Sequence, residues 1–254
     1  MARIIAIANQ KGGVGKTTTT VNLSACLAQA GKKVLTVDSD PQGNTTTGLG
    51  VDKHQLGNSL YHLFLGECLI EDVLIPAGIE NLFLLPSNID LAGSEIELIS
   101  HPQREYILKD ILQKCHHNYD YVLIDCPPSL NLLTINALSA ADSILIPIQC
   151  EYYALEGLMQ LVYTINLVRD KLNPTLDIEG VVFTMYDART NLSLQVVEEV
   201  KTHLDKKAYR CIVPRNVRLS EAPSHGLPIT LYDARSKGAE AYIELAEEVM
   251  NLDG

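Results

Sequence analysis

The sequence lacks any apolar run close to the roughly 18 residues that a membrane-spanning helix needs. Its first apolar stretch, in MARIIAIANQ, is far too short for the core of a signal peptide, and a glycine-rich loop follows it directly. We therefore expect a cytoplasmic protein with neither a membrane span nor a secretion signal.

Paired cysteines are also missing. The chain has six cysteines, but they are scattered without a Cys-x-x-Cys motif and mostly stand beside apolar residues. This pattern argues against a disulfide framework and predicts reduced, buried thiols. Cys115-His116-His117 could supply metal ligands, but consecutive residues on a helix point in different directions and no complementary pair lies nearby. We expect that tripeptide to be an ordinary surface segment.

Positive charge is in short supply. The chain has 20 Lys and Arg against 31 Asp and Glu, which gives a formal net charge of −11. Such a balance opposes a general affinity for polyanions. Any contact with a nucleic acid must therefore be confined to a local patch.

Short apolar runs alternate with longer segments of helical period, which is typical of an α/β protein with a mainly parallel sheet. The near-continuous apolarity of these runs predicts strands buried on both faces. With 46% hydrophobic residues, we expect one domain over residues 1–254, doubly wound, with helices on both faces of the sheet. The predicted strands are residues 4–8, 34–38, 82–86, 121–125, 143–148, 180–184 and 211–214.

The stretch NQKGGVGKTTTT follows the first predicted strand and opens a helical segment, which is the order of a phosphate-binding loop. Lys16 is expected to reach the β- and γ-phosphates, and the Thr17 hydroxyl to hold Mg²⁺. The strict pattern requires glycine at position 10, where this chain has Gln10, and Lys11 is a second lysine at the start of the loop. The predicted nucleotide-binding loop comprises Lys11, Gly12, Gly13, Val14, Gly15, Lys16, Thr17 and Thr18.

Aspartates stand at the carboxyl ends of two predicted strands. Asp38 and Asp40 lie in VDSDPQGN, and Asp125 ends YVLID. An ion that neutralises charge on transferring phosphoryl oxygens needs such acceptors. As alternatives, Asp38 and Asp125 could cap following helices and Asp40, before Pro41, could open a turn.

The segment KGGVGKTT resembles the deviant phosphate loop of the ParA and MinD group of ATPases, and the resemblance extends over essentially the whole chain. It implies that ATP and Mg²⁺ are cofactors and that Lys11 contacts the nucleotide of the partner subunit in an ATP-dependent homodimer. It implies that Asp125 is the Walker B aspartate. It also implies that Asp40 orients the attacking water and that Asp38 helps to order the magnesium shell.

The same resemblance places adenine near the ends of two late strands. The corresponding segments of this chain are FTMYD and VPRNV. The nearest residues to the base would be Thr184, Met185, Pro214 and Asn216.

Residues 186–200 and 214–242 resemble the chromosomal ParA/Soj-type partition ATPases. This likeness implies an ATP-bound dimer that binds double-stranded DNA without sequence preference and associates with the nucleoid. It also implies a ParB/Spo0J-type partner that stimulates ATP hydrolysis. Arg189, Arg215 and Arg218 are the predicted DNA-binding residues. Alternatively, they are surface arginines paired with acids such as Asp187 or Glu221.

Three other functions are compatible with parts of the sequence. A MinD-like membrane protein would end in a basic amphipathic helix, whereas this chain ends AEAYIELAEEVMNLDG, which an anionic lipid surface would repel. A protein resembling the nitrogenase iron protein would need two suitably placed cysteines near the nucleotide, and only Cys126 lies beside Asp125. A nucleotide-controlled switch that binds only proteins remains open, and DNA retention would separate it from a partition ATPase.

Overall fold

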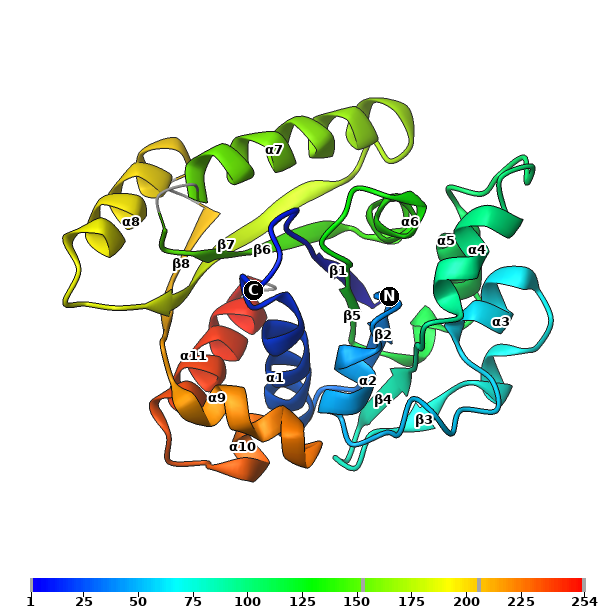
Figure 1. The fold of residues 1–254 in the computed structure, drawn as a ribbon, viewed down its shortest axis with the longest axis horizontal. Coiled ribbons are helices and arrows are strands. Elements are labelled where there is room, and N and C mark those ends of the chain that lie inside the picture. Colours follow the sequence, from blue (N-terminus) through cyan, green and yellow to red (C-terminus); the bar gives the residue numbers. More distant parts are fainter. Residues whose placement is uncertain (1, 152–153, 205–206, 253–254) are drawn as a thin grey trace.

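The computed structural model describes residues 2–151, 154–204 and 207–252, which form a mainly parallel sheet with helices on both faces (Figure 1). In the described residues the sheet has eight strands in the order β3-β4-β2-β5-β1-β6-β7-β8, and only β3 runs antiparallel to its neighbour. The predicted doubly wound α/β fold is thus confirmed. The strands are β1 Arg3–Ile7, β2 Val34–Asp38, β3 Ile75–Pro76, β4 Leu82–Leu85, β5 Tyr121–Asp125, β6 Ser143–Gln149, β7 Asp177–Tyr186 and β8 Ala208–Pro214.

Two apolar clusters cover the two faces of the sheet. One lies under α1, α10 and α11, and the other under α3 to α8. The helices are α1 Lys16–Gln29, α2 Asn44–Gly48, α3 Leu60–Leu65, α4 Leu91–Glu97, α5 Ile107–Gln113, α6 Leu132–Ala140, α7 Ala154–Lys171, α8 Asn191–Leu204, α9 Val217–Glu221, α10 Ile229–Tyr232 and α11 Lys237–Asn251, with short 3₁₀ turns at Ile70–Asp72, His116–Asn118 and Ala222–His225.

The first strand shows why these runs form central strands. Ile5 and Ile7 pack into the cluster below α1, while Ala6, one position along, packs into the opposite cluster. Successive side chains of a strand point to opposite faces, so an apolar residue at every position is buried only when helices cover both faces. The run IIAIA therefore requires the layered arrangement that is observed.

The last helix packs into the core. Tyr242, Leu245 and Val249 of α11 are at most 1% exposed, and Glu248 accepts hydrogen bonds from the Arg210 and Cys211 amides of β8. The apolar side of α11 is therefore occupied by the sheet. None of the helices in the described part of the chain has the length and apolar character needed to cross a membrane.

The cysteines are free thiols, and four of them are buried. Cys115 is one of these, with 7% exposure, so the expected surface location is wrong for this residue, whose side chain packs in the core beside α5. His117 is exposed, as expected. Burial raises the pKa of the Cys115 thiol to about 11.

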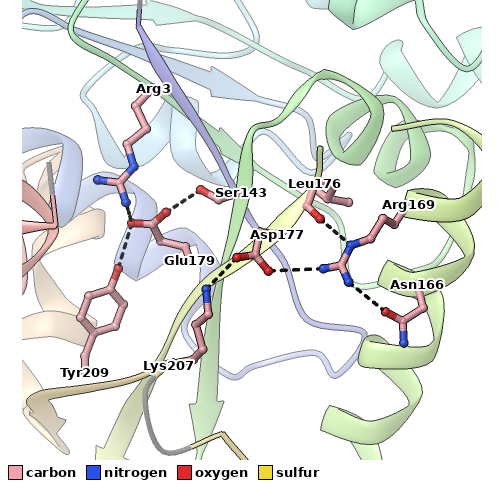
Figure 2. A network of polar contacts seen from close by, with 9 residues as sticks. All are labelled: Arg3, Ser143, Asn166, Arg169, Leu176, Asp177, Glu179, Lys207 and Tyr209. Atoms are coloured by element: carbon pink, nitrogen blue, oxygen red, sulfur yellow. Dashed lines mark hydrogen bonds and ion pairs between the residues drawn. The ribbon is translucent and has the colours of Figure 1, made fainter. Parts of the chain in front are cut away.

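A buried polar network fastens the amino ends of four strands (Figure 2). Glu179 of β7 accepts hydrogen bonds from Ser143 of β6 at 2.5 Å and from the Tyr209 hydroxyl of β8 at 3.3 Å, and it pairs with Arg3 of β1. Gly180 leaves room for this arrangement, because a Cβ at that position would lie 2.4 Å from the Tyr209 ring. The network is at the edge of the sheet opposite to the phosphate loop.

We predict that Gly180→Ala destabilises the fold. The new methyl group must displace a buried ring that is tied to Glu179, and overpacking of this kind costs about 1–3 kcal/mol, or roughly 2–4 °C in Tm per kcal/mol for a chain of this size. Gly157→Ala on α7 is the control, since a Cβ there meets no atom within 4 Å. Thermal unfolding by circular dichroism measures both, and equal Tm values for the two variants would contradict the packing argument.

Candidate functional site

The loop between β1 and α1 has the backbone of an anion cradle. Gly13 and Gly15 adopt φ values of 75° and 90°, which L side chains rarely tolerate. No side chain caps the first turn of α1, and that turn contains no acidic residue. The amide groups and positive end of the helix are therefore available to an anion such as a phosphate.

The two loop lysines lie in different surroundings. Lys16 is only 7% exposed, and its Nζ donates to the backbone oxygen of Lys11 at 3.2 Å. Burial lowers the pKa of Lys16, an effect opposed by the nearby Asp125 carboxylate. The Lys11 side chain is 33% exposed and its Nζ pairs with Glu151 at 2.8 Å. One amine thus lies within the loop, and the other lies outside it.

Asp125, at the end of β5, is fully buried among hydroxyl groups. Its carboxylate accepts hydrogen bonds from Thr17 at 2.8 Å, from Thr45 at 2.7 Å and from Thr20 at 3.3 Å. Of these three threonines, only Thr17 was predicted from the sequence; Thr45 and Thr20 were not. The threonine run at positions 45–47, directly after the aspartate segment, was the available signal.

Asp38 lies beside Asp125 because the two residues are register partners on β2 and β5. Its carboxylate accepts hydrogen bonds from the Thr46 amide at 2.7 Å, from the Thr46 hydroxyl at 2.6 Å and from the Asp40 amide at 3.3 Å. Burial raises the pKa of both carboxyl groups, and in Asp38 the charge of Asp125 adds to the effect. The sheet therefore places two carboxyl groups side by side at one point of its carboxyl edge, where burial disfavours their charged forms.

The residues at this point fit a magnesium–nucleotide complex. Hydroxyl and carboxylate oxygens are ligands that Mg²⁺ prefers, and the bonded pair Thr17 and Asp125 supplies both kinds. The Asp38 oxygens already accept hydrogen bonds from Thr46 and the Asp40 amide. Asp38 is therefore better suited to orient the groups around a magnesium ion than to bind the ion directly. Among the described residues there is no group of three or more His, Cys, Asp or Glu side chains that could hold a metal ion by itself.

Asp40 begins a tight turn, as the alternative interpretation anticipated. Its carboxylate accepts a hydrogen bond from the Gln42 amide at 2.9 Å, and its backbone oxygen accepts bonds from the Gly43 amide and the Ser87 hydroxyl. A Cβ on Gly43 would lie 2.6 Å from the Ser87 oxygen. This close approach fixes the turn against the segment that follows β4.

A cavity of about 320 Å³ opens beside the phosphate loop. Gly15 and Thr18 of the phosphate loop line this cavity, and the Thr184 hydroxyl donates to the Val14 oxygen at 2.7 Å. Met185 holds a φ of 50°, unusual for a side chain of its size. The four residues predicted to lie near the adenine base, Thr184, Met185, Pro214 and Asn216, all line this cavity. Tyr242 of α11, which was predicted to face the core and not the site, lines it too.

The predicted DNA-binding arginines have acidic neighbours. Arg189, after β7, pairs with Asp187 at 2.6 Å, and hydrogen bonds from its side chain and its backbone amide lower the pKa of that carboxyl group. Arg218 on α9 pairs with Glu221 at 2.9 Å. Arg215 lines the cavity beside the phosphate loop. The alternative interpretation, surface arginines paired with Asp187 and Glu221, describes the observed contacts of Arg189 and Arg218.

The fold and the loop together define a nucleotide-binding protein of the P-loop class. In agreement, the sequence profile of a family described as "AAA domain" matches residues 2–178. The chain is 59% identical to the sporulation initiation inhibitor protein Soj of Bacillus subtilis over 249 residues, which cover 98% of each chain. It is 51% identical to the chromosome-partitioning ATPase Soj of Treponema pallidum, over 100% of this chain and 99% of the relative.

Among solved structures, the septum site-determining protein MinD of Pyrococcus horikoshii, complexed with Mg-ADP, has a TM-score of 0.85 and 30% sequence identity, with 100% of this chain and 98% of that chain covered. The chain belongs to the Soj/ParA family of chromosome-partitioning ATPases. It is an ATPase with the P-loop fold, and members of its wider structural group bind adenine nucleotides together with magnesium.

We predict that Lys16→Ala abolishes most nucleotide affinity. Removing one partner of a buried charge pair costs about 2–5 kcal/mol, so the Kd for ATP should rise roughly 30-fold or more. Isothermal titration with ATP and Mg²⁺ measures the change, and Lys11→Ala is the matched control that should keep ATP bound to the monomer. Normal ATP affinity in Lys16→Ala would overturn the assignment of the loop.

Proposed function

We propose that this ATPase cycles between a monomer and an ATP-bound homodimer whose two nucleotides lie between the subunits. In this proposal the dimer binds double-stranded DNA without sequence preference, and a ParB/Spo0J-type partner stimulates hydrolysis and so releases it. The cycle serves the segregation of a replicon.

The different surroundings of the two lysines carry this proposal. Lys16 is buried in the loop that must hold the chain's own phosphates. Lys11 belongs to the same loop, yet its amine lies outside it at the partly exposed Glu151. A second cation outside the cradle is suited to a second nucleotide, namely the one that a partner subunit presents.

Each residue of the site then has a task in hydrolysis. The loop amides and Lys16 bind the phosphates. Thr17 and Asp125 would hold Mg²⁺, which when bound neutralises the charge that develops on the phosphoryl oxygens. Asp38 orients this arrangement, and Asp40 positions the attacking water at the start of its fixed turn. Lys11 of the partner subunit adds the remaining positive charge at the phosphates, so hydrolysis requires the dimer.

Binding of DNA by a chain with a net charge of −11 requires a local patch. Exposed ion pairs such as Arg189–Asp187 and Arg218–Glu221 contribute little stability, so the arginines can exchange a carboxylate for a DNA phosphate. Dimerisation doubles the number of such arginines on one particle. The density of phosphate contacts, and with it the DNA affinity, then depends on ATP.

The same ion pairs favour a second candidate, a nucleotide-controlled switch that binds only proteins. Both arginines already have carboxylate partners, and a patch neutralised in this way offers DNA less net charge. Retention of the ATP-bound dimer on arbitrary duplex DNA distinguishes the two candidates, because the protein-only switch retains none.

We predict that Lys11→Ala and Asp40→Ala restore each other's activity when mixed. Lys11→Ala alone should bind ATP but neither dimerise nor hydrolyse, and Asp40→Ala alone should dimerise without hydrolysis, since water positioning acts on the transition state. In a mixed dimer the site with an intact Asp40 receives Lys11 from its partner. Phosphate release across a series of mixing ratios measures the effect. No activity at any ratio would contradict the trans role of Lys11.

We predict that Arg189→Ala combined with Arg218→Ala weakens DNA binding by the ATP-bound Asp40→Ala dimer and leaves dimerisation intact. The magnitude of the slope of log K against log salt concentration should fall by about one for each DNA phosphate that the variant no longer binds, uniformly across DNA sequences. Arg104→Ala with Lys109→Ala removes the same charge as a control, because these residues lie in or near α5, far from α8 and α9 (Figure 1). Fluorescence anisotropy over a salt series provides the measurement, and an unchanged slope in the first double variant would place the DNA site elsewhere.

A further inference from the structure

Three consecutive side chains fasten the start of the phosphate loop to the segment formed by β6 and α7. Asn9 donates to the Pro147 oxygen at 2.8 Å, and Gln10 donates to the Thr164 hydroxyl at 3.1 Å. Lys11 pairs with Glu151 at 2.8 Å. These residues precede the glycines that form the anion cradle. The departure from the strict loop pattern at Gln10 thus coincides with a contact to a neighbouring helix.

The backbone of Lys11 is fixed on both sides. Its amide donates to the Asn9 side chain at 3.0 Å, and its oxygen accepts the bond from Lys16 Nζ at 3.2 Å. Asn9 is 7% exposed, so this anchor is part of the protein interior. With the backbone held, only the long side chain of Lys11 is free to rotate, and its contact with Glu151 restricts that rotation.

We propose that Glu151 is a positioning residue for Lys11, holding its amine ready for the nucleotide of the partner subunit. The inference rests on the proposed trans role of Lys11 and deepens it. An ammonium group has three donors, so one bond to Glu151 leaves two for phosphate oxygens. An unanchored lysine loses the rotamer freedom of four methylene groups on binding, and an anchored one has given up most of it beforehand.

Glu151 lies outside the loop that is proposed to hold the chain's own phosphates. It lies between β6 and α7, where its backbone oxygen accepts a bond from the Ala154 amide at 3.0 Å, and its side chain is 37% exposed. The contact spans 140 positions of sequence. It therefore sets the position of Lys11 from an element outside the cradle.

The test is Glu151→Gln, which keeps the size of the side chain and removes its charge. ATP affinity of the monomer should stay unchanged, while ATP-dependent dimerisation and turnover fall roughly tenfold. An unanchored Lys11 binds the partner's nucleotide more weakly, and a misplaced catalytic group also lowers the rate. Glu156→Gln, at an exposed acid in the first turn of α7, is the matched control and should behave as the unmodified chain.

Mixing experiments distinguish action through Lys11 from action on the chain's own nucleotide. If Glu151 positions Lys11, Glu151→Gln mixed with Asp40→Ala recovers hydrolysis, because the intact Asp40 then receives a well-placed Lys11. Glu151→Gln mixed with Lys11→Ala does not recover hydrolysis, because neither subunit then supplies its partner with a well-placed Lys11. If Glu151 instead serves its own nucleotide, the two results are reversed, and the inference is overturned.

Two further outcomes are decisive. Stronger dimerisation or faster turnover in Glu151→Gln would identify the ion pair as a restraint that dimerisation must break, and would overturn the positioning role. Failure of Lys11→Ala and Asp40→Ala to restore each other would instead refute the trans role itself. The failure of the inference and the failure of the proposed function therefore give separate results.

Discussion

Two carboxylates, Asp38 and Asp125, lie fully buried on adjacent strand ends, and the site depends on how the chain tolerates them. Burial of a charge is costly unless hydrogen bonds and opposite charge offset it. The threonines at positions 17, 20, 45 and 46 supply hydroxyl donors, and Lys16 supplies a nearby cation. A divalent ion fits the same requirement, because it would add positive charge beside the two buried carboxyl groups.

Those hydrogen bonds also join the parts of the site to one another. Thr17 is in the phosphate loop, whereas Thr45 and Thr46 are in α2, just after Asp40. The Asp125 carboxylate is therefore hydrogen-bonded both to the phosphate loop, through Thr17, and to the helix that follows the Asp40 turn, through Thr45. The Lys11 side chain lies apart from this network and pairs instead with Glu151, between β6 and α7. The chain thus separates the groups that bind its own nucleotide from the cation proposed to serve a partner.

The fold could be predicted from the sequence because its signals are local. Runs such as IIAIA and YVLID are buried strands wherever helices cover both faces, and the glycines before Lys16 are needed for left-handed backbone. The residues at the base cavity were found through resemblance to a family, since nothing in FTMYD by itself indicates a base. All four line the cavity, and their role toward adenine stays a prediction.

The contacts that the sequence does not reveal join residues far apart along the chain. Glu151 meets Lys11 across 140 positions, and Ser87 meets Asp40 across 47. Such pairs depend on strand order, which composition and periodicity do not specify. The arginines show the opposite difficulty. Asp187 and Glu221 lie two and three positions from Arg189 and Arg218, so these ion pairs could be predicted from the sequence. Whether DNA phosphates displace the carboxylates depends on a small difference in free energy, which no sequence pattern indicates.

Sedimentation velocity of the unmodified chain measures whether dimerisation depends on ATP. With Mg²⁺ and a non-hydrolysable ATP analogue, a population of the dimer should appear that grows with protein concentration, while with Mg²⁺ and ADP the chain should sediment as a monomer. A monomer with either nucleotide at saturating concentration, or the same dimer with both, would rule out a dimer that forms because Lys11 of one subunit contacts the γ-phosphate bound by the other.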